Sequence, residues 1–207
     1  MISINQARQA VAEQCQSLES EFVELSQLQG RVASTDIQSP LNLPPFPQSS
    51  MDGYAVALGS ESWTIIGETR AGDPPPPPLN PGEARRIFTG APVPESTSGV
   101  CVVMQEACTV EGDKLQAEMG DIRDGKFVRP TGSAVSLGSN ALPKGTVFRP
   151  GEIGFLGAMG LIGADVHRKV KVSVLASGDE LAPPGTALAP GQIYESNTLA
   201  LSAAVQQ

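Results

Sequence analysis

The sequence holds few of the residues that build metal centres and disulfide frameworks. Its 207 residues include one histidine, His167, and three cysteines, Cys15, Cys101 and Cys108. A single histidine excludes sites made of several histidines. An odd number of cysteines without a Cys-x-x-Cys spacing argues against both disulfide pairing and a zinc site. We therefore expect free thiols, and a solvated surface histidine because basic residues follow His167 directly.

Positive charge and long apolar runs are also scarce. The formal net charge is −8, and the basic residues form no run, whereas sequence-independent nucleic-acid binding needs a positive face. The longest apolar stretch, residues 153–164, is interrupted by glycines and falls short of the roughly 20 residues of a membrane-spanning helix. The N-terminus lacks the apolar segment of a signal peptide. These absences predict a cytoplasmic protein with no nucleic-acid or membrane partner.

Aromatic residues make up only 4% of the chain, while glycine (22) and proline (18) are plentiful. The core must therefore be built from Val, Ile, Leu and Ala. Such a composition favours many tight turns and short strands over long helices. It is not the composition of a disordered chain.

The N-terminal segment carries a helix signal. Ser3 and Gln6 have the spacing of a capping box, and apolar residues then recur at helical intervals at Ile4, Ala7, Val11, Cys15 and Leu18. A short second turn ends at Gly30, and residues 31–37 are predicted to form a strand.

A β-rich region follows. Four short apolar or β-branched runs predict strands at residues 63–67, 84–88, 100–105 and 109–116. The last run contains Glu111-Gly112-Asp113-Lys114, which is typical of a hairpin turn. Residues 73–81 include five consecutive prolines, which cannot join a strand ladder and should form an extended loop.

The C-terminal part reads as the opening of an α/β unit. Residues 150–160 have a helix signal, with proline at the first helical position and glycine at the end. Residues 170–176 form a continuous apolar-rich run that predicts a buried strand. A turn at 177–180 and a helix from about Ser196 or Asn197 follow. One strand and one helix cannot bury each other fully, so we expect either a shortened chain or a partner that completes the sheet.

Five ordered segments resemble one family. They are PPFPQSSMDGYAV (44–56), GETRAGDP (67–74), PGEARRIFTGAPVPE (81–95), VVMQE (102–106), and SGDEL to GQIYESN (177–197). Together they are similar to the molybdopterin molybdenumtransferases of the MoeA type, which are related to the C-terminal domain of gephyrin. A β-rich binding module unrelated to molybdenum would not place these segments in this order.

The resemblance implies an α+β multidomain fold that is elongated and homodimeric. Residues 1–39 and 135–168 would form a helical dimerisation domain from two chain segments. Residues 40–134 would form an inserted β-rich domain. Residues 169–207 would be the incomplete start of an α/β domain that binds molybdopterin.

The same resemblance implies a transferase. It would insert molybdate into adenylylated molybdopterin and release AMP, with Mg²⁺ as the usual divalent cation and the molybdopterin-adenylylating protein of the pathway as partner. The site would lie between the β-rich domain of one subunit and the α/β domain of the other. A non-catalytic dimerisation or scaffold module of the same family is the alternative.

Three residues match the catalytic positions of the family, namely Asp52, Thr89 and Glu180. Taken alone, Asp52 is either a turn-forming residue before glycine or a carboxylate that holds a hard cation. Thr89 is either part of a strand-ending turn or a substrate-side hydroxyl, and Glu180 is either a charged loop residue or a ligand. With the family match, Asp52 and Glu180 become the expected metal ligands.

Four further residues are expected to bind substrate or cofactor. Ser49 can hydrogen-bond a ligand or cap a turn, and Gly90 allows close approach of the backbone. Arg129 offers a forked contact to phosphate or molybdate, or a surface ion pair. Asp179 follows the predicted strand, where ligands collect in open α/β sheets.

The chain also departs from the family pattern at three places. Ala134 stands where the family usually has an aspartate, which removes an acidic site residue. Val100 replaces an acidic residue, and Pro47-Gln48 replaces Asp-Asn. The change at Ala134 bears on metal or molybdate handling and favours the scaffold alternative.

Overall fold

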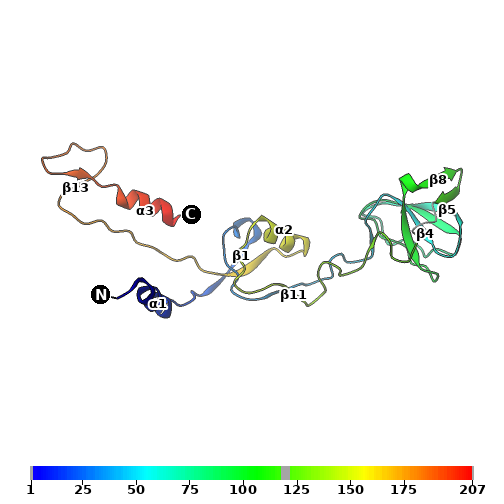
Figure 1. Ribbon diagram of the computed structural model, residues 1–207, viewed down its shortest axis with the longest axis horizontal. Coiled ribbons are helices and arrows are strands. Elements are labelled where there is room, and N and C mark those ends of the chain that lie inside the picture. Colours follow the sequence, from blue (N-terminus) through cyan, green and yellow to red (C-terminus); the bar gives the residue numbers. More distant parts are fainter. Residues whose placement is uncertain (1, 118–121, 207) are drawn as a thin grey trace. The chain divides into compact units, whose positions relative to one another are not determined.

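The computed structural model describes residues 2–117 and 122–206. The chain divides into two compact units, one formed by Glu21–Val166 and the other by the residues up to Ser20 together with those from His167 onward. The fold is α+β, with three α-helices among the described residues, as Figure 1 shows. None of the described helices is long and apolar enough to cross a membrane.

A curled six-stranded sheet forms the β-rich part of the larger unit (Figure 1). Its strands, in spatial order, are β7 (Val100–Met104), β4 (Gly53–Ala57), β6 (Glu83–Ile87), β5 (Ser62–Thr69), β9 (Lys114–Ala117) and β8 (Cys108–Glu111). Strand β4 runs antiparallel to both β6 and β7, β5 and β6 are parallel, and β8 and β9 form a hairpin. The four predicted β-runs are confirmed, and so is the hairpin turn.

The alternation of side chains gives this sheet a hydrophobic core on each face. One core is built around Trp63 and contains Val56, Ala84, Cys101, Val103 and Leu115. The other contains Ala55, Ala57, Leu79, Ile87, Ala91, Val93 and Val102. Trp63 is 1% exposed, and its indole N–H donates to the carbonyl oxygen of Ala57 at 2.7 Å. The core is therefore aliphatic apart from its one indole, as the composition predicts.

The proline-rich segment lies outside every strand, as predicted. Asp73 closes a turn at its start, where the Asp73 side chain accepts from the N–H of Arg70 at 2.6 Å. Leu79 anchors its end, because the side chain is buried and the N–H donates to the carbonyl oxygen of Glu95 at 2.8 Å. The five prolines thus form a loop that is fixed at both ends.

A third core lies in the same unit and surrounds helix α2 (Pro150–Ala158). Phe148, Leu28, Leu156 and Val166 are fully buried there. A two-stranded sheet of β1 (Ser20–Glu24) and β12 (Gly163–His167), neither of which the sequence predicted, and a 3₁₀ turn, η1 (Leu25–Gln27), complete this region. Helix α2 has proline in its first turn, as predicted.

The strand predicted at residues 31–37 is wrong for most of its length. Val32 bridges to Val147, Ala33 bridges to Val166, and only β2 (Ile37–Gln38) is a strand. Successive residues pair with different neighbours, so no single ladder forms along the segment.

Two antiparallel segments connect this region to the six-stranded sheet. Strand β2 pairs with β11 (Asn140–Leu142), Leu43 bridges to Val135, and β3 (Gln48–Ser49) pairs with β10 (Val128–Arg129). The segment that leads into the six-stranded sheet and the segment that leaves it therefore run side by side. This arrangement brings Ser49 and Arg129 onto neighbouring short strands.

The smaller unit confirms two predicted helices. Helix α1 (Ile4–Gln14) has the capping box of Ser3 and Gln6 and ends at Gln14, so Leu18 lies beyond it. Helix α3 (Asn197–Val205) follows a parallel pair of short strands, β13 (Leu181–Ala182) and β14 (Ile193–Tyr194). No residue of α1 or α3 is buried.

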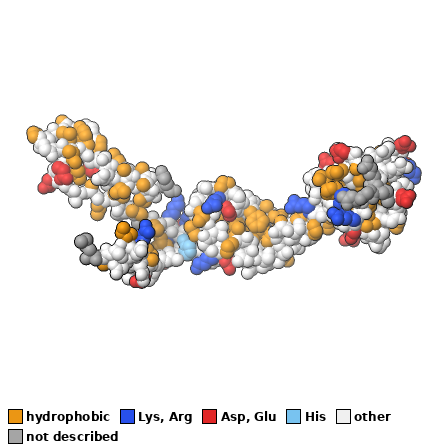
Figure 2. Space-filling model, in the orientation of Figure 1, with side chains coloured by type: hydrophobic (Ala, Val, Ile, Leu, Met, Phe, Trp, Pro, Cys, Tyr) orange, Lys and Arg blue, Asp and Glu red, His pale blue; other side chains and the backbone are white. Residues whose placement is uncertain are grey.

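The buried strand predicted at residues 170–176 is wrong. This segment has no strand assignment, and Leu175 is 91% exposed. A strand needs a neighbour for its backbone groups, and the described residues supply none here. Many apolar side chains of this unit are exposed, which Figure 2 shows as orange surface over its C-terminal elements: Val170, Val172, Leu188, Ile193, Leu199, Leu201 and Val205.

The three cysteines are free thiols, as predicted. His167 is partly buried rather than fully solvated, and its Nδ1 lies 2.8 Å from the carbonyl oxygen of Leu18.

Gly53 sets the spacing between β4 and β7. A Cβ atom placed there would lie 1.9 Å from the carbonyl oxygen of Val103. We therefore expect Gly53→Ala to lower the free energy of unfolding of the sheet by about 2–3 kcal/mol, as overpacking against immovable backbone does. Chemical denaturation followed by the fluorescence of Trp63 measures this loss.

Gly154→Ala is the matched control, because a Cβ atom at Gly154 meets nothing within 4 Å. This change, in the middle of α2, should not lower the free energy of unfolding, because alanine favours a helix by about 1 kcal/mol over glycine. Equal effects of the two substitutions would contradict the proposed role of Gly53.

Candidate functional site

Asp52 is held at the start of β4 by a residue distant in sequence. Its Oδ1 accepts two hydrogen bonds from Thr89, one from the backbone N–H at 2.7 Å and one from the side-chain hydroxyl at 2.9 Å. The Asp52 carbonyl oxygen accepts from the N–H of Gln105 at 3.2 Å. Both Asp52 and Thr89 are exposed. Their contact joins MDGYA to TGAPVP through Oδ1 of Asp52.

These hydrogen bonds determine the charge state of the carboxylate. The N–H of Thr89, then its hydroxyl, and to a smaller extent the positive charge of Arg86, hold the pKa of Asp52 below its usual value. An acceptor of two hydrogen bonds is stabilised in its ionised form. Asp52 is therefore an anion at neutral pH.

Asp52 and Thr89 form a corner of the sheet, and Ser49 on β3 supports this corner. It is 1% exposed, and its hydroxyl donates to the carbonyl oxygen of Met51 at 2.7 Å. Its backbone carbonyl accepts from the N–H of Gly90 at 2.8 Å. Ser49 thus fixes the turn that leads to Asp52, which favours the turn-capping reading of this residue over ligand contact.

Gly90 allows the turn after Thr89. Its φ is +83°, a conformation that favours glycine. The next residue, Ala91, accepts from the N–H of Ser49 at 3.0 Å. Thr89 is consequently presented at the end of β6 with its N–H turned toward Asp52.

Arg86 is a further polar residue at this corner and was not among the predicted site residues. It lies directly opposite Tyr54 in the β4–β6 register. Its guanidinium donates to Oε1 of Gln105 at 2.5 Å. Because side chains alternate along β6, Arg86 and Arg85 point to opposite faces of the sheet. The register between β4 and β6 then puts Arg86 on the face of Tyr54, beside Asp52.

Two ionisable groups follow Gln105. The Gln105 side chain donates to Oε1 of Glu106 at 3.0 Å, and this bond is the main reason that the pKa of Glu106 lies below its usual value. Burial raises the pKa of the Cys108 thiol to about 11. Glu106 is thus a second anion near Asp52, and Cys108 is a protonated thiol rather than a nucleophile.

Three predicted residues remain, Arg129 in the larger unit and Asp179 and Glu180 in the smaller one. Arg129 is exposed on β10, paired with Gln48. Asp179 and Glu180 belong to the smaller unit, in the turn before β13, where the Glu180 carbonyl accepts from the N–H of Ile193 at 2.8 Å. Among the described residues, no three His, Cys, Asp or Glu side chains gather closely enough to hold a metal ion.

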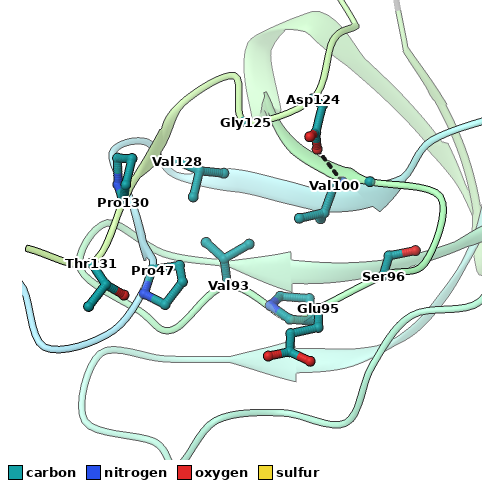
Figure 3. A pocket seen from close by; sticks show the side chains of 12 residues that line it. Pro47, Val93, Glu95, Ser96, Val100, Asp124, Gly125, Val128, Pro130 and Thr131 are labelled. Atoms are coloured by element: carbon teal, nitrogen blue, oxygen red, sulfur yellow. Dashed lines mark hydrogen bonds between the residues drawn. The ribbon is translucent and has the colours of Figure 1, made fainter. Parts of the chain in front are cut away.

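The structure describes the three places at which the sequence departs from the family pattern, namely Ala134, Val100 and Pro47-Gln48. Ala134 is exposed and its N–H donates to the carbonyl oxygen of Leu43 at 2.9 Å. The N–H of Val100 is capped by the carboxylate of Asp124 at 2.9 Å. Pro47 and Val100 both line a groove of about 480 Å³, shown in Figure 3.

That groove lies between the segments 93–100 and 124–131, and prolines and valines make up half of its lining residues. Figure 3 shows Val93 and Val128 pointing into it, with Glu95 and Ser96 at its border. It contains none of the seven residues predicted for the site. The contact between Asp52 and Thr89 therefore lies outside the lining of this groove.

The comparison with known families agrees with this geometry. A family model described as MoeA N-terminal region (domain I and II) matches residues 2–160. The chain belongs to this family. The match contains Ser49, Asp52, Thr89, Gly90 and Arg129, and ends before the smaller unit's C-terminal segment.

Named relatives carry the family's activity in their names. The chain is 38% identical to molybdopterin molybdenumtransferase 2 of Mycobacterium tuberculosis, over 100% of the chain and 52% of the relative. It is 34% identical to the molybdopterin molybdenumtransferase of Haemophilus influenzae, over 95% of the chain and 50% of the relative. A gephyrin from Dictyostelium discoideum is 28% identical. The chain spans about half the length of the enzymes that it matches.

Solved structures agree as well. Two structures of a molybdopterin biosynthesis MoeA protein from Pyrococcus horikoshii cover 100% of the chain, with TM-scores of 0.80 and 0.88 and sequence identities of 32% and 28%. The chain covers 54% and 57% of those proteins.

The contact between Thr89 and Asp52 makes a pH prediction. Thr89→Val removes the hydroxyl but keeps the backbone N–H, so the pKa of Asp52 should rise part of the way toward its usual value. Because the folded pKa is depressed, ionised Asp52 stabilises the fold above the pKa of the unfolded chain, and this contribution is lost as pH falls through the folded value. NMR titration of the carboxyl carbon measures the midpoint.

Thr89→Ser retains the hydroxyl and should leave the midpoint close to that of the unmodified chain. If Thr89→Val titrates at the unmodified midpoint, the hydroxyl does not bond Asp52 in solution.

Proposed function

We propose that this chain supplies the N-terminal part of a molybdopterin molybdenumtransferase. The enzyme inserts molybdate into adenylylated molybdopterin and releases AMP, a step of molybdenum cofactor biosynthesis. The observation that carries the proposal is the bond between Asp52 and Thr89, which joins the two most specific motifs of the chain at one exposed corner. The relatives' names support the reaction.

The corner suits charge handling rather than proton transfer. Asp52 is ionised and exposed, and both of its bonds to Thr89 use Oδ1, so it is suited to a hard cation. Mg²⁺ typically takes one or two carboxylates together with substrate phosphates. Asp52 fits that pattern, with Glu180 as the second carboxylate. The cation would offset the repulsion between molybdate and the phosphate of the nucleotide.

Each remaining residue has a role in this proposal. Thr89 orients Asp52 and presents its hydroxyl to the substrate, and Ser49 fixes the turn. Gly90 lets substrate approach the backbone. Arg129 contacts an oxyanion in forked geometry, and Asp179 assists Glu180 from the α/β segment.

The proposal includes assembly. Because one subunit would provide the Asp52 corner and the other would provide Glu180, a homodimer completes the site. The exposed apolar residues of α1, with Ile4 75% and Val11 64% exposed, are suited to an interface. The molybdopterin-adenylylating protein would deliver the substrate, in the cytoplasm.

A non-catalytic scaffold of the same family is the second candidate. Ala134 favours it, because the family's aspartate is absent there and the alanine is exposed. A methyl group cannot bind a cation or a water that a carboxylate would orient. Under this alternative the chain has the same fold and forms the dimer but does not catalyse the reaction.

AMP release separates the two candidates. A chimera in which this chain replaces the corresponding half of the M. tuberculosis relative should release AMP from adenylylated molybdopterin when molybdate and Mg²⁺ are present. Asp52→Ala in the chimera should lower the rate by about a hundredfold or more, the scale for removal of one electrostatic group. Stability should change little, because Asp52 is exposed.

Asp113→Ala is the control, since Asp113 is an exposed aspartate at the β8–β9 turn of the same sheet. It should leave AMP release unchanged. A folded chimera that releases no AMP would overturn the transferase proposal and leave the scaffold. If that chimera then gains activity on Ala134→Asp, the missing carboxylate is the cause.

A further inference from the structure

The guanidinium of Arg86 lies over two aromatic rings. Its guanidinium carbon lies 5.0 Å from the centre of the Tyr54 ring and 5.2 Å from the centre of the Phe88 ring. Tyr54 is opposite Arg86 in the β4–β6 pair, and Phe88 is the residue directly after β6. A guanidinium that contacts two rings is stabilised as a cation and loses little rotational freedom on binding a ligand.

One hydrogen bond occupies part of this guanidinium. Arg86 donates to Oε1 of Gln105, and within the described part of the chain it forms no ion pair with Asp52 or Glu106. Those two carboxylates are bonded by neutral donors instead, Asp52 by Thr89 and Glu106 by Gln105. A guanidinium has five N–H donors, so most of the Arg86 fork is available to a ligand.

The neighbouring Arg85 is a contrasting case on the opposite face of β6. Its Nε donates to the hydroxyl of Thr69 at 2.7 Å, and its Nη2 donates to the carbonyl oxygen of Glu68 at 3.2 Å. Arg85 therefore links β5 to β6, and its donors serve the sheet. Arg86 donates one hydrogen bond to the Gln105 side chain, in the turn after β7, and its side chain is partly exposed.

We propose that Arg86, oriented by Tyr54, Phe88 and Gln105, is an oxyanion subsite beside Asp52. Its ligand is a tetrahedral oxyanion, either molybdate or the phosphate of the adenylylated pterin. The planar fork of arginine binds such groups through two parallel hydrogen bonds. This inference rests on the proposed function, and it names Arg86 as the residue that binds one of the anionic groups of that reaction.

The surrounding charges make the subsite dependent on a divalent cation. Asp52 and Glu106 are both anions near Arg86, and the positive charge of Arg86 contributes to lowering the pKa of each. Two negative charges beside one positive charge repel an oxyanion until a cation at Asp52 offsets them. Binding of an oxyanion at Arg86 should therefore strengthen when Mg²⁺ is added.

Anion binding by the chain itself tests the subsite without activity. Isothermal titration with inorganic phosphate and, separately, with molybdate should show binding of at least one anion, stronger with Mg²⁺ than without it. Arg86→Lys keeps the charge but loses the fork, and should weaken that binding about tenfold, the scale of a lost charged hydrogen bond. Arg85→Lys is the matched control and should bind as the unmodified chain does.

Kinetics of the chimera identify the source of the oxyanion. Arg86→Lys should raise the KM for molybdate if molybdate is the ligand, or the KM for adenylylated molybdopterin if the phosphate is. Trp63 fluorescence during denaturation verifies that both variants keep the fold.

The outcomes separate the two proposals. An inactive chimera whose N-terminal half still binds an anion through Arg86 would overturn the proposed function and keep the subsite. An active chimera in which both lysine variants behave alike, or a chain that binds neither anion with Mg²⁺, would overturn the subsite and leave the proposed function standing.

Discussion

The close approach of β4 to β7 is the constraint on which the candidate site depends. Gly53 is opposite Met104 in this pair, and no side chain fits between its Cα and the carbonyl oxygen of Val103. The approach fixes where β4 begins, and so it fixes the position of Asp52, the residue before the strand. A larger residue at Gly53 would displace both the strand and the carboxylate.

One face of the sheet combines a buried hydrophobic core at one end with the polar residues of the candidate site at the other. On the face of Tyr54 and Arg86, the far end of the sheet is a core around Trp63, whereas the near end carries Asp52 and Gln105. Because the polar residues stand where β4, β6 and β7 begin or end, they reach solvent without leaving buried groups unpaired. The same strands that bury the indole therefore present the charged side chains.

Much of this could be predicted from local sequence. The strands β5 to β9 have strong local patterns, and both terminal helices have clear signals. Strand β4 was missed because the motif that contains it was interpreted as a turn, although its residues alternate with the register of β6 and β7. The segment 170–176 is apolar like a buried strand, but its conformation depends on a neighbour that the described residues do not supply.

The candidate site remains a prediction, of which the structure describes the local contacts. The family motifs named Asp52 and Thr89, and the structure brings them into contact. Arg86 is adjacent in sequence to an arginine of the opposite face, so no local pattern distinguishes the two. Only the register with Tyr54 and the bond to Gln105 identify Arg86. Whether Glu180 joins Asp52 depends on assembly, which lies beyond a single chain's local signals.

The position of molybdenum tests the central claim most directly. In crystals of the chimera with molybdate, Mg²⁺ and the pterin substrate, anomalous scattering locates the metal. Our account predicts a molybdenum peak at the corner, beside Asp52, with an oxyanion, either the molybdate or the substrate phosphate, on the Arg86 fork. A molybdenum peak found only elsewhere, with Asp52 bonded to Thr89 and otherwise facing solvent, would contradict it.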